Sequence, residues 1–271
     1  MTHSDPGFEC KRLFSTVIMF PSTMAENWKP YLCNVNDKLA SIFVNLGLRG
    51  EVPIASKPWL LWTWVYFQSP RADGLSDGKE APTLYKIEAA LNPSLRYTCG
   101  AIPCGRITTE GRREFYFYAE THDGLLKAVN AGLKGFEGHR FDVGSQKDPE
   151  WEQYLNVLYP SSEDLQRIAN MDLLDVLRDK GDVLTAAREV QHWMYFPSES
   201  ARLLFRDAAV AVGYKFVSES GSKRDSPFGI VVGRTQSIEQ ASIDRTVIEL
   251  LHLSQRFDGE YDGWETPIVT Q

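Results

Sequence analysis

Residues 159–164 read Tyr-Pro-Ser-Ser-Glu-Asp and divide the chain into two parts. Proline disfavours a helical conformation in the residue before it, so Pro160 closes the segment that precedes it. Ser161 and Asp164 then have the spacing of a helix N-cap residue and its partner three positions later. The predicted segments are a loose N-terminus and two domains: 1–14, 15–160 and 161–271.

The part after Pro160 alternates helices with short strands. A Gly follows the first expected helix, and Ser237 with Gln240 has the pattern of a capping box that opens the last one. The expected helices are 162–180, one after Pro197 and one after Ser237; the expected strands are 189–196, 214–217, 228–232 and a final one. This order predicts an α+β fold with helices on one face of a small, mostly antiparallel sheet, and a ferredoxin-like arrangement.

The part before Pro160 is richer in strands. Runs of β-branched and aromatic residues indicate strands, and a 3.6-residue apolar period indicates helices. The expected strands are 16–20, 40–46, 59–67, 97–107 and 113–118, and the expected helices are 80–91 and 123–133. A second α+β domain with helices on one face of a mostly antiparallel sheet is therefore predicted.

The net charge of −7 is concentrated in the second part. Residues 163–271 carry 18 Asp and Glu against 12 Lys and Arg, which is a net charge of −6. Phosphate binding needs clustered Lys and Arg, so this balance argues against a nucleic-acid surface there. It favours a basic protein partner.

Known catalytic and metal-binding motifs do not occur in the chain. There is no Gly-x-Gly-x-x-Gly, Walker loop, Gly-x-Ser-x-Gly or His-Glu-x-x-His, and Cys10, Cys33, Cys99 and Cys104 form no Cys-x-x-Cys pair. No cofactor, metal or catalytic residue is predicted, and the thiols are expected to be reduced. The longest apolar run, 59–67, is about half of a membrane span, so a cytoplasmic protein is expected.

Several residues are candidates for a functional role. Residues 258–263 resemble the start of a calcium loop, but the twelfth position is Val269 where a bidentate Glu is needed, so a turn with solvated carboxylates is expected. His192 lies alone within a predicted strand, which favours a structural role. Trp264 is expected to pack its ring on the core, while Asp262 and Glu265 form a rim that can meet a basic partner.

The hairpin segment 112–118 has an arginine pair followed by four aromatic residues. Single-stranded RNA could stack on such rings. Alternation of core and surface aromatics along a strand is the preferred interpretation, with Arg112 and Arg113 pointing to opposite sides.

Three segments of the second part stand out: Leu177–Asp182, Arg188–Phe196 and the closing Tyr261–Thr266. Together they resemble the RraB family, regulators of ribonuclease E activity, and the resemblance covers roughly residues 165–268. The family tends to carry Ile-Glu-His where this chain has Val190-Gln191-His192, so one acidic residue is missing. The resemblance implies a non-catalytic inhibitor that binds the endoribonuclease, which makes Asp262, Trp264 and Glu265 the expected partner-binding residues.

The first part resembles the domain-of-unknown-function family number 695. The matching segments are Gly105–Thr108, Gly111–Tyr118, Asp148–Trp151 and Tyr154–Pro160. This family implies no activity. The alternative to a protein-binding regulator is therefore an enzyme or RNA-binding protein whose site lies in the first part, near residues 105–118.

If the chain divides near Ser161, residues 1–160 and 161–271 should each fold when expressed alone. Each part is long enough to bury its own core. Thermal melts of the two fragments check this, and each should show a cooperative transition. The absence of a cooperative melt from both fragments would contradict the two-domain interpretation.

Overall fold

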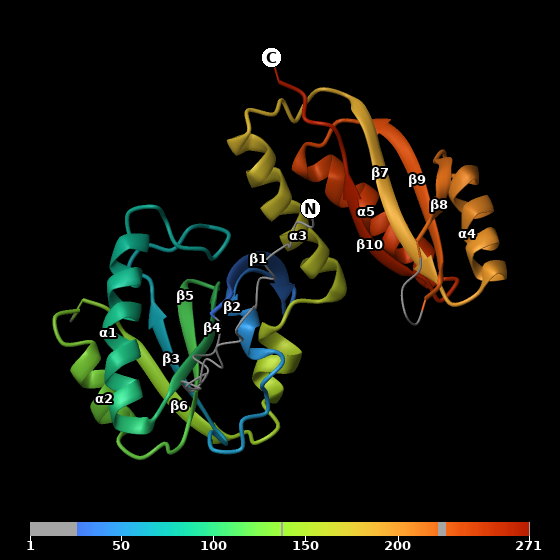
Figure 1. Ribbon diagram of the computed structural model, residues 1–271. Coiled ribbons are helices and arrows are strands. Elements are labelled where there is room, and N and C mark those ends of the chain that lie inside the picture. Colours follow the sequence, from blue (N-terminus) through green and yellow to red (C-terminus); the bar gives the residue numbers. More distant parts are fainter. Residues whose placement is uncertain (1–25, 137, 222–225, 271) are drawn as a thin grey trace, which may run out of the picture.

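The computed structural model describes residues 26–136, 138–221 and 226–270 (Figure 1). Cys10 and the strand predicted at 16–20 lie outside these residues. The described chain has helices and two antiparallel sheets, one of six and one of four strands, each with its own apolar core. The predicted α+β class is confirmed for both halves, whereas independent folding of each half stays a prediction.

The first sheet has the strand order β1-β2-β4-β5-β3-β6, and every neighbouring pair is antiparallel. Its strands are β1 (Trp28–Val35), β2 (Lys38–Asn45), β3 (Trp59–Tyr66), β4 (Ile102–Thr109), β5 (Arg112–Ala119) and β6 (Phe141–Lys147). The helices α1 (Ala81–Cys99) and α2 (Leu125–Gly132) pack on the β5-β3-β6 part of one face. The same face of β1, β2 and β4 lies beyond this apolar core.

β5 is buried on both faces. Phe115 and Phe117 pack with α1 and α2, while Tyr116 and Tyr118 belong to the core on the opposite face. The expected alternation of core and surface aromatics is therefore wrong, because a second layer covers the other face. No ring of this run is left as a platform for RNA bases.

The second layer is the segment that ends the N-terminal half. Trp151 is fully buried and stacks on Tyr118 with ring centroids 3.8 Å apart. Asp148 accepts hydrogen bonds from the Tyr118 hydroxyl at 2.5 Å and from the backbone N–H groups of Glu152 and Gln153. One carboxylate thus joins β5 to the start of a short π-helix, Gln153–Leu158. A helical segment therefore packs on each face of this sheet.

Two strands and one helix differ from the prediction. β1 and β6 were not predicted, and α1 continues to Cys99, where a strand was expected from Tyr97. The buried residues Leu91, Leu95 and Cys99 continue the helical stripe past Pro93. Pro93 is exposed on the helix side opposite to this apolar stripe, so the stripe continues to pack on the core and the helix extends past Pro93.

The C-terminal half has the element order α3-β7-α4-β8-β9-α5-β10 and the strand order β10-β7-β9-β8. Its elements are α3 (Ser162–Asp179), β7 (Arg188–Phe196), α4 (Glu199–Ala211), β8 (Lys215–Ser220), β9 (Phe228–Gln236), α5 (Gln240–Gln255) and β10 (Glu260–Glu265). All neighbouring strands are antiparallel. The ferredoxin-like arrangement stays an interpretation of this order.

One predicted cap forms and the other does not. The Ser161 hydroxyl accepts the Asp164 N–H at 3.1 Å, as expected for an N-cap. The capping box at Ser237 is wrong, because α5 begins at Gln240 and its N-cap residue Glu239 makes no side-chain capping bond. The face of α5 that packs on the core includes the buried residues Ile243, Val247, Leu250, Leu251 and Ser254.

The two halves touch where α3 lies beside β1. Lys29 forms an ion pair with Asp172 at 2.7 Å, and both side chains are partly exposed. Exposed pairs of this kind contribute about 0–1 kcal/mol, so this contact adds little to the stability of either half. Within the residues that the structure describes, no helix combines the length and the apolar character needed to cross a membrane.

The C-terminal core contains a buried histidine. His192 is fully buried, and its Nδ1 lies 2.9 Å from the Tyr261 hydroxyl, while its Nε2 has no partner. Burial, with the nearby charge of Arg234, lowers the pKa of His192 to about 3. The imidazole is thus neutral in the folded state, as its expected structural role requires.

This histidine should make folding sensitive to acid. Below about pH 6.5 the His192 imidazole becomes protonated in the unfolded chain, whereas in the folded chain it stays neutral down to about pH 3. The free energy of unfolding should therefore fall as the pH decreases through this window, with a limiting slope of about 1.4 kcal/mol per pH unit from this group. Urea unfolding at pH 7, 6, 5 and 4.5 should show a shallower pH dependence for His192→Gln than for the natural chain.

The buried Met194 on the same strand and in the same core provides the control. Met194→Leu changes no titrating group and should keep the steeper dependence of the natural chain. An unchanged slope in His192→Gln would show that this histidine does not set the response to acid.

Candidate functional site

The residues predicted to bind a partner lie on β10, but they do not converge. Trp264 packs against the C-terminal core, and its Nε1 donates a hydrogen bond to Asn170 Oδ1 at 2.8 Å. Asn170 in turn donates to Asp244 at 2.8 Å, which links β10, α3 and α5. Trp264 is therefore part of the fold, as its expected core role requires.

The two acidic residues beside Trp264 are exposed. Asp262 lies at a bulge between β10 and β7, and Glu265 pairs with Gln191. Because neighbouring residues of a strand point to opposite faces, Glu265 points away from the core face on which Trp264 packs. The structure thus supports a rim of carboxylates on this strand, with Trp264 beneath it.

That face of the four-stranded sheet has no helix of the described chain packed on it. The alternate residues of β7, from Val190 to Phe196, face the core formed with α3, α4 and α5. The residues between them are exposed or half-buried and form the open face: Glu189, Gln191, Trp193 and Tyr195. The helices α3, α4 and α5 all contribute residues to the core on the opposite face of this sheet.

Glycines of β9 shape the open face. A Cβ at Gly229 would lie 2.0 Å from Ser220 Oγ and 3.0 Å from the Tyr195 ring, and one at Gly233 would lie 3.1 Å from Val217 Cγ2. The absence of a side chain at these two positions lets Ser220, Val217 and the Tyr195 ring lie close to β9. Glu260 and Glu265 pair with Tyr195 and Gln191 from the neighbouring strand, so half-buried aromatic rings and carboxylates share one surface.

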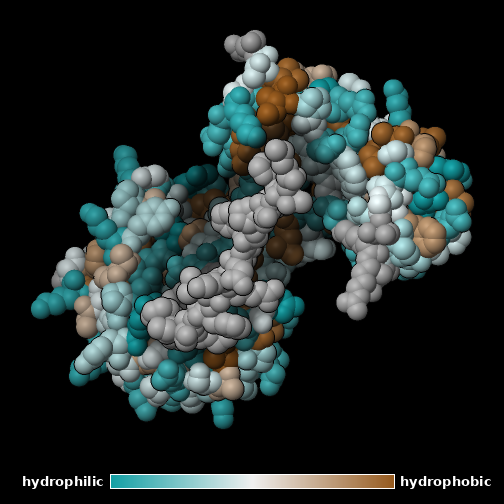
Figure 2. Space-filling model, in the orientation of Figure 1, coloured by the Kyte–Doolittle hydropathy of each residue, from teal (hydrophilic) through white to brown (hydrophobic). Residues whose placement is uncertain are grey.

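The helix side has exposed apolar residues of its own. They belong to α4 and to the residues that follow it: Leu203, Leu204, Val210, Val212 and Phe216. Figure 2 shows brown patches among teal residues over the C-terminal half. Scattered apolar residues are normal on protein surfaces, so they do not define a site.

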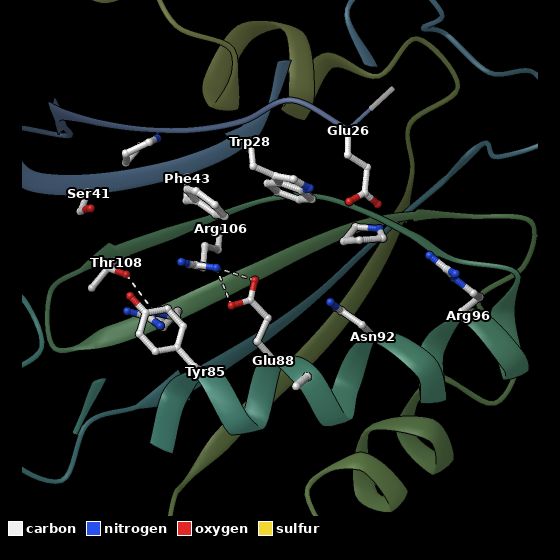
Figure 3. Close-up of a pocket in the computed structure, with 14 residues that line it drawn as sticks. Glu26, Trp28, Ser41, Phe43, Tyr85, Glu88, Asn92, Arg96, Arg106 and Thr108 are labelled. Atoms are coloured by element: carbon white, nitrogen blue, oxygen red, sulfur yellow. Dashed lines mark hydrogen bonds and ion pairs between the residues drawn. The ribbon is translucent and has the colours of Figure 1, made fainter. Parts of the chain in front are cut away.

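The N-terminal half contains a groove of about 700 Å³ beside α1. One wall consists of α1 residues, and the other wall and the floor come from β1, β2, β4 and Arg113 of β5 (Figure 3). The lining residues used below are Trp28, Phe43, Tyr85, Glu88, Ala89, Asn92, Arg96, Arg106, Thr108 and Arg113. A volume of this size is typical of a small-molecule site.

A stack of planar groups crosses the groove. The Trp28 and Phe43 rings are stacked with centroids 5.2 Å apart, and the Arg106 guanidinium lies 4.2 Å from the Phe43 centroid. Glu88 accepts two hydrogen bonds from Arg106 Nη1, at 2.6 and 2.5 Å. Arg106 is thus held by a carboxylate and by a ring, and its charge is neutralised locally.

Arg113 differs from Arg106. It is only 5% exposed, its Nε donates to Thr108 at 3.1 Å, and its Nη1 has no hydrogen-bond partner. Burial, with repulsion from Arg106, lowers the pKa of Arg113 to about 10, so the guanidinium is still charged at neutral pH. A buried charge with an unused donor is costly in a folded protein.

The prediction that Arg112 and Arg113 point to opposite sides is confirmed. Arg112 pairs with Glu114 and lies over the Trp64 ring, whereas Arg113 lies beside Tyr85 at the groove. The remaining groove residues on α1 and β1 were missed, because β1 was not predicted. The α1 residues could have been found from the sequence, because the polar residues Tyr85, Glu88, Asn92 and Arg96 are spaced three or four positions apart and so share one side of a helix.

Metal binding finds no support in the described part of the chain, where no cluster of three His, Cys, Asp or Glu residues has suitable geometry. Glu260 and Asp262 of the calcium-like motif lie on β10, and Asp258 lies in the turn before it. Cys33, Cys99 and Cys104 are free thiols.

Comparisons with known proteins add family matches but no similar curated protein. No curated protein matches the chain. The solved structures that align include an unknown protein from Galdieria sulphuraria (11% identity, 78% of this chain and 99% of that chain, TM-score 0.21) and a putative glycine cleavage system transcriptional repressor (10%, 77% and 98%, TM-score 0.22). Likeness at these TM-scores carries no argument about fold or function.

Family matches divide the chain as the resemblances did. Residues 26–159 match the family of unknown function DUF695. Residues 167–266 match the family Regulator of ribonuclease activity B, RraB. The chain therefore joins a segment that matches DUF695, which includes the groove, to a segment that matches RraB, which includes the open face of the second sheet.

Proposed function

We propose that this protein is a non-catalytic regulator that binds an endoribonuclease of the ribonuclease E type and so modulates RNA turnover. The match of residues 167–266 to Regulator of ribonuclease activity B is the observation that carries this proposal. Regulation by binding requires a surface for a protein partner and no catalytic group.

The open face of the second sheet supports such a surface. Aromatic residues are enriched in the cores of protein interfaces, and here Trp193 and Tyr195 are only half-buried. Glu189, Glu260 and Glu265 add negative charge around these rings, in a half of net charge −6. A basic partner surface complements this arrangement, and charge complementarity accelerates association.

The alternative function, an enzyme or RNA-binding protein with a site in the N-terminal half, has one observation in its favour. The groove contains Arg106 and Arg113, which belong to the 105–118 segment where that site was expected. The arrangement of the groove suits binding of a ligand, and its described lining residues include no nucleophile with an adjacent general base.

Exposed carboxylates on β10 should contribute to binding and not to stability. The double variant Asp262→Asn, Glu265→Gln should melt within about 0.5 kcal/mol of the natural chain, as is normal for surface sites. Its association with purified ribonuclease E should be slower and less dependent on salt, because steering charge is removed. Stopped-flow or surface-plasmon measurements at two salt concentrations check this.

A matched control is the double variant Glu199→Gln, Asp207→Asn on the helix side, where both side chains are more than half exposed. It removes the same charge and should associate almost as fast as the natural chain. Trp264→Ala should instead destabilise the fold by about 3 kcal/mol, the lower end for a buried aromatic. Equal effects of the two double variants would move the interface away from β10.

The purified protein should neither hydrolyse RNA nor need a metal. This follows from the absence of recognisable catalytic motifs in the sequence. Labelled RNA incubated with the protein, with and without EDTA, should remain intact. Nuclease activity that copurifies through several columns and disappears with a point change in this chain would contradict the proposal.

A further inference from the structure

We propose that the groove beside α1 binds a nucleoside monophosphate group, with its phosphate on Arg113 and its base between the strand aromatics and α1. The group can belong to a free mononucleotide or to the end of a single-stranded RNA. This site is separate from the open face of the second sheet, and the proposal does not depend on the ribonuclease partner.

Arg113 provides the anion-binding donor. Its guanidinium is 5% exposed, lines the groove and keeps Nη1 without a partner in the described chain. Thr108 satisfies only its Nε. An oxyanion is the acceptor that best compensates a buried guanidinium, because hydrogen bonds between ionised groups are the strongest in proteins.

Charge in the groove favours an anion at this point. Arg106 is neutralised by the bidentate Glu88, so Arg113 keeps its charge available. Arg96 stands exposed at the other end of the α1 wall, and Glu26 lies across the groove from it (Figure 3). Three arginines against two glutamates leave the lining with one net positive charge, in contrast to the acidic C-terminal half.

Planar side chains favour a ring-bearing anion over a bare one. Trp28 and Phe43 form one stack, and Tyr85, which is 53% exposed, offers its ring from α1. Base–aromatic stacking contributes about 1–3 kcal/mol per base. Inorganic phosphate uses none of these contacts.

The α1 wall also presents acceptors for a base. Asn92 Oδ1 is buried and has no hydrogen-bond partner. Pro93 has no N–H, so it cannot donate to the carbonyl of Ala89, which lines the groove. In Figure 3, Asn92 faces the side of Trp28 and Glu26. Exocyclic amino groups of adenine, cytosine or guanine are donors that match these acceptors.

The groove is tested by isothermal titration calorimetry of the full chain. The probes are AMP, CMP, GMP, a 5′-phosphorylated RNA tetramer, adenosine and inorganic phosphate. We expect at least one nucleotide or the RNA to bind about tenfold or more tightly than either adenosine or phosphate, since each lacks one half of the recognised group. Tighter binding of the tetramer than of every mononucleotide assigns the group to an RNA end, and equal or weaker binding assigns it to a free nucleotide.

Matched variants connect the binding to the groove. Arg113→Gln should weaken binding about tenfold or more, whereas Arg112→Gln, on the opposite face of the same strand, should leave it within about twofold. Asn92→Leu has a similar volume and should weaken binding because it removes the acceptor for the base, and thermal melts establish that each variant is folded. If Arg113→Gln fails to fold, Asn92→Leu decides.

Three outcomes overturn the proposal. They are no binding of any nucleotide or of the RNA at millimolar concentration, binding of phosphate alone as tight as that of the nucleotides, and equal losses in the folded Arg112 and Arg113 variants. None of them bears on binding of the C-terminal half to a ribonuclease.

Discussion

Burial of β5 on both of its faces is the constraint on which the N-terminal half depends. Phe115 and Phe117 hold α1 and α2 on one side, and Tyr116 and Tyr118 hold the segment that ends in the short π-helix on the other. The stack of Trp151 on Tyr118 and the Asp148 carboxylate fix that second layer. Buried polar groups of this kind must be satisfied, and here Asp148 satisfies three donors at once.

The groove is a consequence of this arrangement. Six strands form a wider sheet than two helices can cover, and α1 and α2 pack on the β5-β3-β6 part, where the large apolar residues are. On the remaining strands the same face carries Ser41, Phe43, Arg106 and Thr108. A mixed polar and aromatic surface beside a helix is suited to a ligand, because it combines fixed hydrogen-bonding groups with planar contacts.

The C-terminal half solves the same packing problem differently. Its three helices lie on one side of the sheet, so alternation along β7 leaves Trp193 and Tyr195 on a face without a second layer. Negative charge surrounds that face, whereas the groove of the N-terminal half is lined by arginines. The two halves therefore present surfaces of opposite character, one suited to a basic protein and the other to an anion.

The apolar periodicity of the sequence, and the residues that begin or end helices, determined most of the helices and strands, because both are local properties of the chain. Pro160 and the Ser161 cap marked the start of α3. The acidic balance of the second half and the family motifs could also be identified from the sequence alone.

Tertiary structure alone decided which faces of the two sheets are covered. Only the fold could show that Trp151, far along the chain from β5, buries Tyr118, or that Arg113 meets Asn92 and Trp28 in one groove. Contacts between residues distant in sequence leave no periodic signal, and they determine where a strand is buried twice and where a surface stays open.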